Sequence, residues 1–209
     1  MRVIALLSTK GGAGKTSLAT ALAVETGAVL LDLDPQSSAC RWRDRREAET
    51  PVVTAVAPAR LQPTLQAIEA QGVADVVLDT PPRSETAALE AARAADLVVV
   101  PCRPQMVDLE TVPTTTQLLA LARDPLAVAI LVAVPPRGQR ADQARRAIHG
   151  LGLRVCPHTI GHRAAWGDAG ALGLAVTEYQ PQGRAAAELR RIAEWLRKLV
   201  DQPRLLEES

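Results

Sequence analysis

The stretch STKGGAGKTS, residues 8–17, contains residue types that suit phosphate binding. Gly11, Gly12 and Gly14 allow the backbone to turn its N–H groups toward phosphate oxygens. A helix is expected to begin at Lys15, and its N-terminal end carries a partial positive charge that attracts anions. The Lys15 ammonium can reach the β- and γ-phosphates of a nucleotide. This loop is therefore the first candidate for a nucleotide-binding site.

The remaining loop residues complete the expected site. The Thr16 hydroxyl can ligate Mg²⁺, Ser17 is well placed for the α-phosphate, and Ala13 lies between the glycines in the same backbone turn. The alternative is a glycine-rich turn between a strand and a helix that binds nothing. So many matching residue types within eight positions argue against that alternative.

The loop departs from the usual pattern G-x-x-x-x-G-K-[ST], because Thr9 stands where the first glycine is expected and Lys10 follows it. The chain contains 21 Arg but three Lys, and two of those are Lys10 and Lys15. A lysine supplies a compact ammonium, whereas arginine supplies a planar fork. Two lysines five residues apart therefore indicate a specific requirement for ammonium groups.

Three aspartates follow apolar runs that read as buried strands. Asp32 and Asp34 lie in LLDLDPQ, and Asp79 ends VVLDTPP in the arrangement of a Walker B carboxylate that holds Mg²⁺ through water. Asp34 lies further along its strand and is better placed to orient water near the γ-phosphate and to contact the metal shell. For Asp32 and Asp34, a role as strand-end caps remains an alternative. A buried Asp79 would be costly without a compensating metal.

These residues need a parallel sheet to bring them together. Short apolar runs alternate with helical patterns, which predicts an α/β fold, a three-layer sandwich with a mostly parallel twisted sheet flanked by helices. In such a sheet, ligands bind at the carboxyl ends of the strands. Strands are expected at 2–8, 28–34, 51–56, 74–82, 97–101 and 127–135, with a broken one at 153–160. Helices are expected at 15–26, 84–96, 108–123, 139–150 and 184–200, and one after residue 61; Ser84 is the expected cap of the second.

Composition sets further bounds. With 209 residues, 47% apolar and 22% charged, the chain is expected to form one domain over 1–209, without a separate N-terminal DNA-binding domain. The formal charge of +1 does not by itself point to nucleic acid. Three widely spaced cysteines fit a reducing cytoplasm, and no run approaches the roughly 18 apolar residues of a membrane span. A metal site at Cys156, His158 and His162 is not expected, since no fourth ligand is near.

The segments KGGAGKTS, LLDLDPQSSA, VVLDTPP and LVVVPCRPQMVDLE, in this order and spacing, resemble the ParA/MinD family of deviant Walker P-loop ATPases. The chain is most similar to the short ParA group, which includes ParF-like partition ATPases. The resemblance implies an ATP-dependent sandwich homodimer in which Lys10 reaches the phosphates of the partner. Lys15, Thr16, Asp34 and Asp79 match the phosphate, Mg²⁺ and catalytic positions, with Lys10, Lys15 and Asp34 as the catalytic residues.

The resemblance further implies a cytoplasmic, nucleoid-associated ATPase with ATP and Mg²⁺ as cofactors. The ATP-bound dimer would bind DNA without sequence preference and drive partition of plasmid or chromosome DNA, and a ParB-like or other adaptor protein would stimulate hydrolysis. One alternative is a positioning ATPase for a protein cargo, such as a chemoreceptor cluster or microcompartment. Others are a P-loop metabolic enzyme of the dethiobiotin synthetase type and an interaction protein that binds ATP without hydrolysing it.

Two further expectations concern the base and DNA. Where many relatives place Asn against adenine, this chain has Pro135 and Pro136, which are expected to pack on the ring. The acidic tail at 201–209, broken by Pro203, does not suit membrane attachment. The expected DNA contacts are Arg163, Arg190, Arg191, Arg197 and Lys198, although Glu188 and Glu194 dilute their charge and leave a solvated helix face as the alternative.

Overall fold

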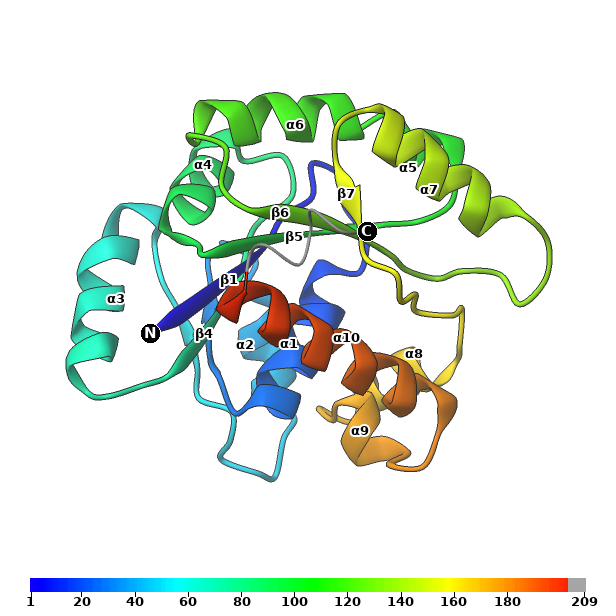
Figure 1. Ribbon diagram of the computed structural model, residues 1–209. Helices are drawn as coiled ribbons and strands as arrows, with labels where there is room; N and C mark the ends of the chain where they lie inside the picture. The colour runs from blue at the N-terminus through cyan, green and yellow to red at the C-terminus, as the bar shows by residue number, and fades with distance from the viewer. Residues whose placement is uncertain (203–209) are drawn as a thin grey trace.

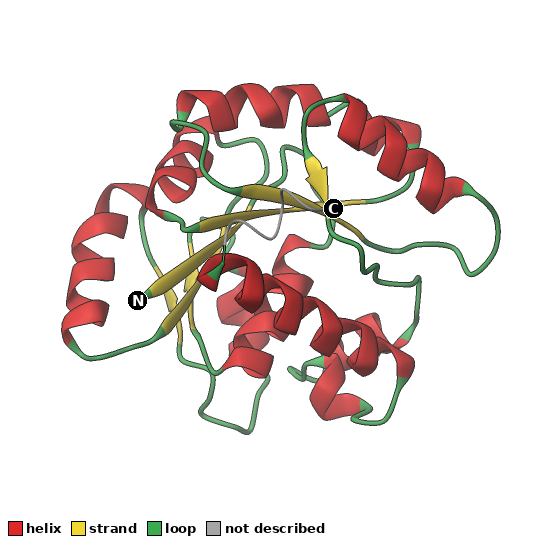
Figure 2. Cartoon of the chain, viewed as in Figure 1, coloured by secondary structure: helices red, strands yellow, loops and turns green. Residues whose placement is uncertain are grey.

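A seven-stranded sheet forms the centre of the computed structural model, which describes residues 1–202. The strand order is β3-β2-β4-β1-β5-β6-β7, and all neighbouring strands pair in parallel. Figure 2 shows the strands sandwiched between two layers of helices. The strands are β1 Arg2–Leu6, β2 Val29–Asp32, β3 Val53–Ala55, β4 Asp75–Asp79, β5 Leu97–Cys102, β6 Ala127–Leu131 and β7 Arg154–Val155. The expected three-layer α/β sandwich is confirmed.

Helices cover both faces of the sheet and bury a separate apolar core on each (Figure 1). One layer consists of α1 Lys15–Thr26, α2 Ser38–Arg43, α8 Ala165–Ala171, α9 Val176–Tyr179 and α10 Arg184–Asp201. The opposite layer consists of α3 Leu61–Ala70, α4 Glu85–Ala94, α5 Met106–Leu109, α6 Val112–Leu121 and α7 Arg140–Gly150; a 3-10 turn, η1 Pro58–Arg60, precedes α3. Because both faces are covered, the central strands are apolar on both sides.

Local sequence accounts for several helix ends. The α1 helix ends at Gly27, whose φ of 69° suits a residue without a Cβ atom. The Ser84 hydroxyl accepts a hydrogen bond from the Ala87 amide at 3.4 Å, so the expected cap of α4 is confirmed. The long α10 helix buries the apolar stripe predicted from its spacing, including Leu189, Ile192 and Leu196.

The strand order places the carboxyl end of β1 at the centre of the sheet. β1 pairs with β4 on one side and β5 on the other, with Leu6 opposite Asp79 and Val99. Loops after neighbouring strands therefore diverge to opposite sides at this point, and this divergence creates the crevice in which ligands of open α/β sheets bind. The glycine-rich loop follows β1 directly.

A partly buried ion pair joins the segment after α2 to α9, a short helix that the sequence did not predict. Arg46 Nη2 lies 2.7 Å from Glu178 Oε1, and the Arg46 side chain is 1% exposed. The same guanidinium lies 4.6 Å from the centre of the Trp42 ring and donates to the carbonyl of Gly173 at 2.7 Å. This cluster anchors the α8–α9 segment against the end of α2.

The predicted elements differ from the structure chiefly at their ends. The expected strand at 153–160 reduces to two residues in β7, and the expected strand at 127–135 ends at residue 131. Within residues 1–202, none of the helices combines the length and apolar character needed to cross a bilayer. The prediction that the C-terminal tail does not attach to a membrane depends on residues around Pro203, and these lie outside the described residues.

Candidate functional site

The glycine-rich loop forms one wall of an open cavity of about 700 Å³ at the carboxyl edge of the sheet. Gly12 and Gly14 adopt φ values of 74° and 86°, which side-chain-bearing residues rarely adopt. A Cβ atom added to either residue, or to Gly11, would meet no protein atom within 4 Å. The space in front of the loop is therefore free for a ligand. Residues 11–17 all line the cavity, as do Asp34 and Pro81.

Lys15 lies inside this loop with a residue exposure of 6%. Its ammonium donates to the carbonyls of Ser8 at 3.3 Å and Lys10 at 3.4 Å. Burial lowers the pKa of Lys15, and the nearby charges of Asp79 and Asp34 oppose that shift. The loop thus holds a partly desolvated cation beside a cavity lined by the glycine-rich backbone, an arrangement suited to a polyphosphate.

Asp79 is the most unusual polar group at the site. It is 1% exposed, and neither of its carboxylate oxygens accepts a hydrogen bond from any group in residues 1–202. Burial raises the pKa of Asp79 to about 7, although Thr16 and Lys15 act in the opposite direction. A buried carboxylate without a partner is costly, so it is a strong candidate for contact with a cation that the protein binds.

The residues present fit a Mg²⁺ ion beside the phosphates. Thr16 and Asp34 line the cavity, the buried Asp79 lies next to Thr16, and these three residues would hold the ion. A hydroxyl and carboxylates are the hard oxygen ligands that Mg²⁺ prefers, and the bound ion would neutralise the charge of the phosphates.

Asp32 and Asp34 have different roles in the structure. The Asp32 carboxylate is 1% exposed and accepts hydrogen bonds from the amides of Asp34 at 3.0 Å, Ala39 at 2.9 Å and Cys40 at 3.1 Å. These contacts make Asp32 the anchor of the α2 N-terminus, the capping role left open by the sequence. Asp34 instead lines the cavity, where it also accepts from the Gln36 amide at 2.8 Å.

Lys10 forms an ion pair within its own chain. Its ammonium lies 3.1 Å from the carboxylate of Asp108, and the Lys10 side chain remains 32% exposed while that of Asp108 is 4% exposed. Asp108 follows β5 in α5, and its role was not predicted, although its segment belongs to the quoted motifs. The two lysines of the loop thus occupy separate positions, one inside the loop and one at its outer edge.

A second cavity, of about 420 Å³, adjoins the loop on the side of β6. Ala13, Ser17 and Leu18 belong to its wall, which places it next to the phosphate cavity. The remaining wall is formed by Gly14, Arg103, Val132, Ala133, residues 160–164, Trp166 and Gly167. A mostly apolar cavity of this size beside a phosphate loop suits a nucleoside.

Pro135 and Pro136 do not line this cavity in the described part of the chain. The backbone turns at Ala133, where φ is 51°, and Val134 then forms an isolated bridge with Gly161. The prolines come directly after this bridge and are not among the residues that line the cavity. Their contact with adenine stays a prediction, and the structure offers other side chains for that role.

Two of these side chains, Arg103 and Trp166, were missed by sequence reasoning. Arg103 lines both cavities and donates through Nη2 to the carbonyl of Gly12, while its buried Nε–H has no partner within residues 1–202. The buried Nε1–H of Trp166 likewise lacks an acceptor there. Arg103 immediately follows the buried strand β5, a position that could have signalled its place at the site.

The predicted DNA-contact residues lie apart from the cavities, except Arg163. Arg163 lines the second cavity and pairs with Glu188, which also accepts from the Gly161 amide at 3.1 Å. Most of the others also have acidic partners: Arg190 with Glu25 at 3.8 Å, Arg197 with Asp75 at 4.0 Å, and Lys198 with Glu194 at 2.7 Å. Arg191 donates to the carbonyl of Ala187 at 3.2 Å. Most of the cations expected on α10 therefore have a carboxylate nearby, although Asp75 is held chiefly by Arg2 at 2.6 Å.

The cysteines and histidines form no metal site within residues 1–202, where no group of three potential His, Cys, Asp or Glu ligands is found. Burial raises the pKa of the Cys156 thiol to about 12. This thiol is therefore neutral near pH 7, consistent with a structural role.

Comparisons with known proteins agree with this geometry. A family model described as the CobQ/CobB/MinD/ParA nucleotide binding domain matches residues 4–206. Maintenance of carboxysome distribution protein A from Gloeobacter kilaueensis is 35% identical over 204 residues, covering 93% of this chain and 94% of the relative. The protein of the same name from Halothiobacillus neapolitanus is 29% identical over 199 residues, covering 88% and 91%.

Among solved structures, the septum site-determining protein MinD from Pyrococcus horikoshii OT3, complexed with Mg-ADP, has a similar fold. The TM-score is 0.76, with 17% sequence identity and coverage of 95% of this chain and 96% of the other.

Proposed function

The chain belongs to the CobQ/CobB/MinD/ParA nucleotide-binding family, and on this premise we propose that it is a dimerising ATPase that positions a cargo in the cell. ATP with Mg²⁺ is its cofactor, as predicted. Binding of ATP favours the dimer, and hydrolysis returns the chain to the monomer. Hydrolysis requires little beyond positioning and charge stabilisation, so turnover is slow until a partner completes the site.

The observation that carries this proposal is the separation of the two loop lysines. Lys15 is buried within its own loop and faces its own phosphate cavity. Lys10 lies at the outer edge, partly exposed and held by Asp108. A second subunit with its own phosphates would offer Lys10 a stronger anionic partner than one carboxylate. Exchange of Asp108 for those phosphates would couple nucleotide binding to dimer formation.

The proposed cargo is a protein microcompartment. The sequence favoured plasmid or chromosome DNA, with a protein cargo as the alternative. Both relatives described above are named for carboxysome distribution, and one is 35% identical over nearly the whole chain. Their names support the alternative, a protein microcompartment as cargo. Nucleoid DNA then serves as the track on which the ATP-bound dimer resides, and an adaptor protein on the cargo stimulates hydrolysis.

A metabolic enzyme of the same P-loop branch is the second candidate function. Such an enzyme needs a substrate site beside the γ-phosphate, but it does not need a lysine at the position of Lys10. The Lys10–Asp108 pair therefore favours the switch.

The experiment that tests the switch measures dimerisation by light scattering with ATP, with ADP and without nucleotide. We expect the wild type to dimerise with ATP. Lys10→Ala should remain monomeric yet bind ATP with an affinity within about threefold of the wild type, because Lys10 contacts the partner's nucleotide. Lys15→Ala should lose both properties. Dimerisation of Lys10→Ala with ATP, or a nucleotide-independent oligomer of the wild type, would contradict the proposal.

A further inference from the structure

The segment between β6 and β7 carries many more positive than negative side chains. Residues 137–154 include five arginines and one acid, Asp142. The rest of the chain has 19 Lys and Arg against 22 Asp and Glu, so the excess positive charge of the protein resides in this segment. Four of its arginines, which we call the α7 arginine surface, are exposed: Arg137, Arg140, Arg146 and Arg154.

The arginines of this surface lack the acidic partners found on α10. Within residues 1–202, none of the four forms an ion pair or a side-chain hydrogen bond, whereas Arg163, Arg190, Arg197 and Lys198 each have a carboxylate within 4.0 Å. An arginine that must leave a carboxylate before it contacts a phosphate gains less free energy from that contact. Unpaired arginines carry no such penalty, so the α7 arginine surface presents the stronger attraction for a polyanion.

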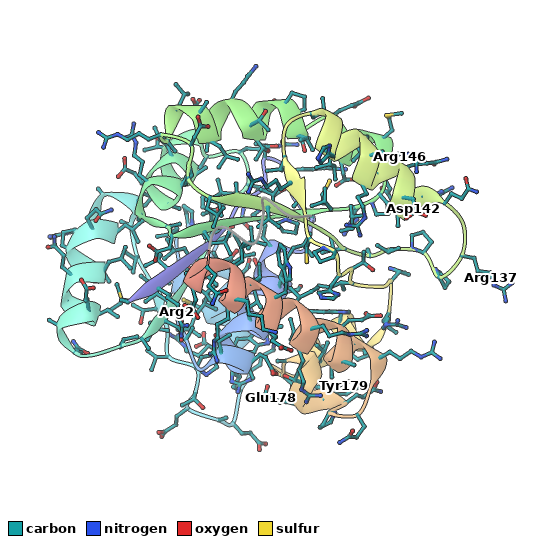
Figure 3. The ribbon with its side chains drawn as sticks, viewed as in Figure 1. Arg2, Arg137, Asp142, Arg146, Glu178 and Tyr179 are labelled. Carbon is teal, nitrogen blue, oxygen red and sulfur yellow. The ribbon has the colours of Figure 1, made fainter. Side chains whose placement is uncertain are left out.

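The backbone constrains both the loop before α7 and the helix itself. Pro135 and Pro136 restrict the loop before Arg137, and Gly138 turns the chain with a φ of 100° before α7 begins. The side chain of Arg145 donates to the carbonyls of Cys156 at 2.6 Å and Pro157 at 3.3 Å, which fixes α7 against the segment after β7. Figure 3 shows Arg137 and Arg146 extending from the same side of the molecule, with Arg137 at its outer edge.

The chemistry of the surface indicates a duplex phosphate backbone as the partner. Proteins that bind single strands stack bases on aromatic rings, and residues 127–160 contain no Phe, Trp or Tyr. Protein interfaces depend on large apolar or aromatic anchors. The exposed residues around these arginines include the polar Gln139, Asp142, Gln143 and His149, and the apolar Met106 and Leu151 lie in a groove that Arg140 also lines. Arg137, Arg146 and Arg154 do not line this groove, and exposed arginines without aromatic neighbours suit sequence-independent contacts to phosphates.

We propose that the α7 arginine surface, rather than α10, provides the main contact with duplex DNA. This inference rests on the proposed DNA-binding function of the ATP-bound dimer. It replaces the predicted contacts at Arg190, Arg191 and Arg197 with a surface more than 35 residues earlier in the chain. The prolines expected to contact adenine acquire a different role here, since they hold the loop that presents Arg137.

The test compares two triple variants with the same loss of charge, measured by fluorescence anisotropy with a duplex of random sequence in the presence of ATP. We expect Arg137→Ala/Arg140→Ala/Arg146→Ala to weaken binding at least about 30-fold and to lower the slope of log K against log salt by about 2 or more. Arg190→Ala/Arg191→Ala/Arg197→Ala should weaken binding less than about threefold. Replacing the first three arginines by lysines should preserve binding, because phosphate contacts depend mainly on charge.

Each outcome bears on the inference. If the α7 triple variant binds duplex as tightly as the wild type and the α10 triple variant does not, the inference is overturned and the contact returns to α10. Wild type that dimerises with ATP yet binds no duplex would overturn both the inference and the DNA-binding part of the proposed function. Tighter binding to polyglutamate or to anionic vesicles than to duplex at equal charge would also overturn it. Circular dichroism and ATP affinity should be unchanged in both variants, since all six side chains are exposed.

Discussion

On the phosphate side of the nucleotide cleft, the chain presents glycine backbone, a buried ammonium and a buried carboxylate without a partner. On the base side it presents a mostly apolar cavity in which the N–H groups of Arg103 and Trp166 lack acceptors. The first side rests on central strands of the sheet, and the second on loops and short helices near its edge. Buried charge is therefore concentrated where the phosphates bind, and N–H groups without acceptors lie where the base binds.

The largest effect is expected from Lys15→Ala, which removes the central cation of the phosphate side. Two or more charge-assisted hydrogen bonds to phosphate would be lost, so ATP affinity should fall roughly 10²–10³-fold in isothermal titration calorimetry. Adenosine, which has no phosphates, is the control ligand, and its affinity should not change. An equal loss for ATP and adenosine would show that the two sides are not energetically separate.

A smaller effect is expected from Glu178→Gln, which tests the support of the base side. The Arg46–Glu178 pair anchors α8 and α9, whose neighbouring residues line the base cavity. With a nearly buried Arg46 left without its carboxylate, the free energy of unfolding should fall by about 2 kcal/mol in urea denaturation near pH 7. Glu194→Gln removes an exposed carboxylate paired with Lys198 and should leave the unfolding midpoint unchanged.

The pH dependence of the same pair has a defined sign. Hydrogen bonding to Arg46 lowers the pKa of Glu178, and burial partly opposes this shift. Its stabilisation is therefore fully present above the unfolded pKa of about 4.3 and is lost as pH falls through the lowered folded pKa. The stability difference between the wild type and Glu178→Gln should shrink over that acid range. A constant difference down to pH 3 would contradict this assignment.

The smallest effect is expected from Trp166→Phe, which keeps a ring in the base cavity but removes its N–H group. One neutral hydrogen bond contributes about 0.5–1.5 kcal/mol, so ATP affinity should fall roughly three- to tenfold. Tripolyphosphate, which has no base, should bind both proteins equally. Unchanged ATP affinity would remove Trp166 from base recognition and return Pro135 and Pro136 to consideration.

The sequence predicted the sheet and the phosphate loop because both depend on residues close together in the chain. Apolar runs identified the central strands, and the glycines at 11, 12 and 14 identified the loop whose open face the structure shows. Short helices such as α2 and α9 have too few residues for a helical period to be read. Contacts with other parts of the chain set their positions; in α2, the amides of Ala39 and Cys40 donate hydrogen bonds to the Asp32 carboxylate.

The sequence could not identify pairings between distant residues. Lys10 and Asp108 are 98 residues apart, and Arg163 and Glu188 are 25 apart. A list of cations on α10 therefore overstated its attraction for DNA, because their carboxylate partners come from α1, β4 and α10 itself. The base cavity likewise combines residues that follow four separate strands, β1, β5, β6 and β7, and sequence periodicity does not show which of them meet.

The position of Trp166 gives the protein a natural optical probe. Its indole lies in the wall shared by the base cavity and a neighbouring cavity that Trp42 also lines. The chain has three tryptophans, so selective excitation of tryptophan gives emission from few sources. With Trp42 and Trp195 replaced by Phe, the remaining signal would follow entry of the base in real time. Loading of the base and association of the subunits could then be timed separately in one stopped-flow experiment.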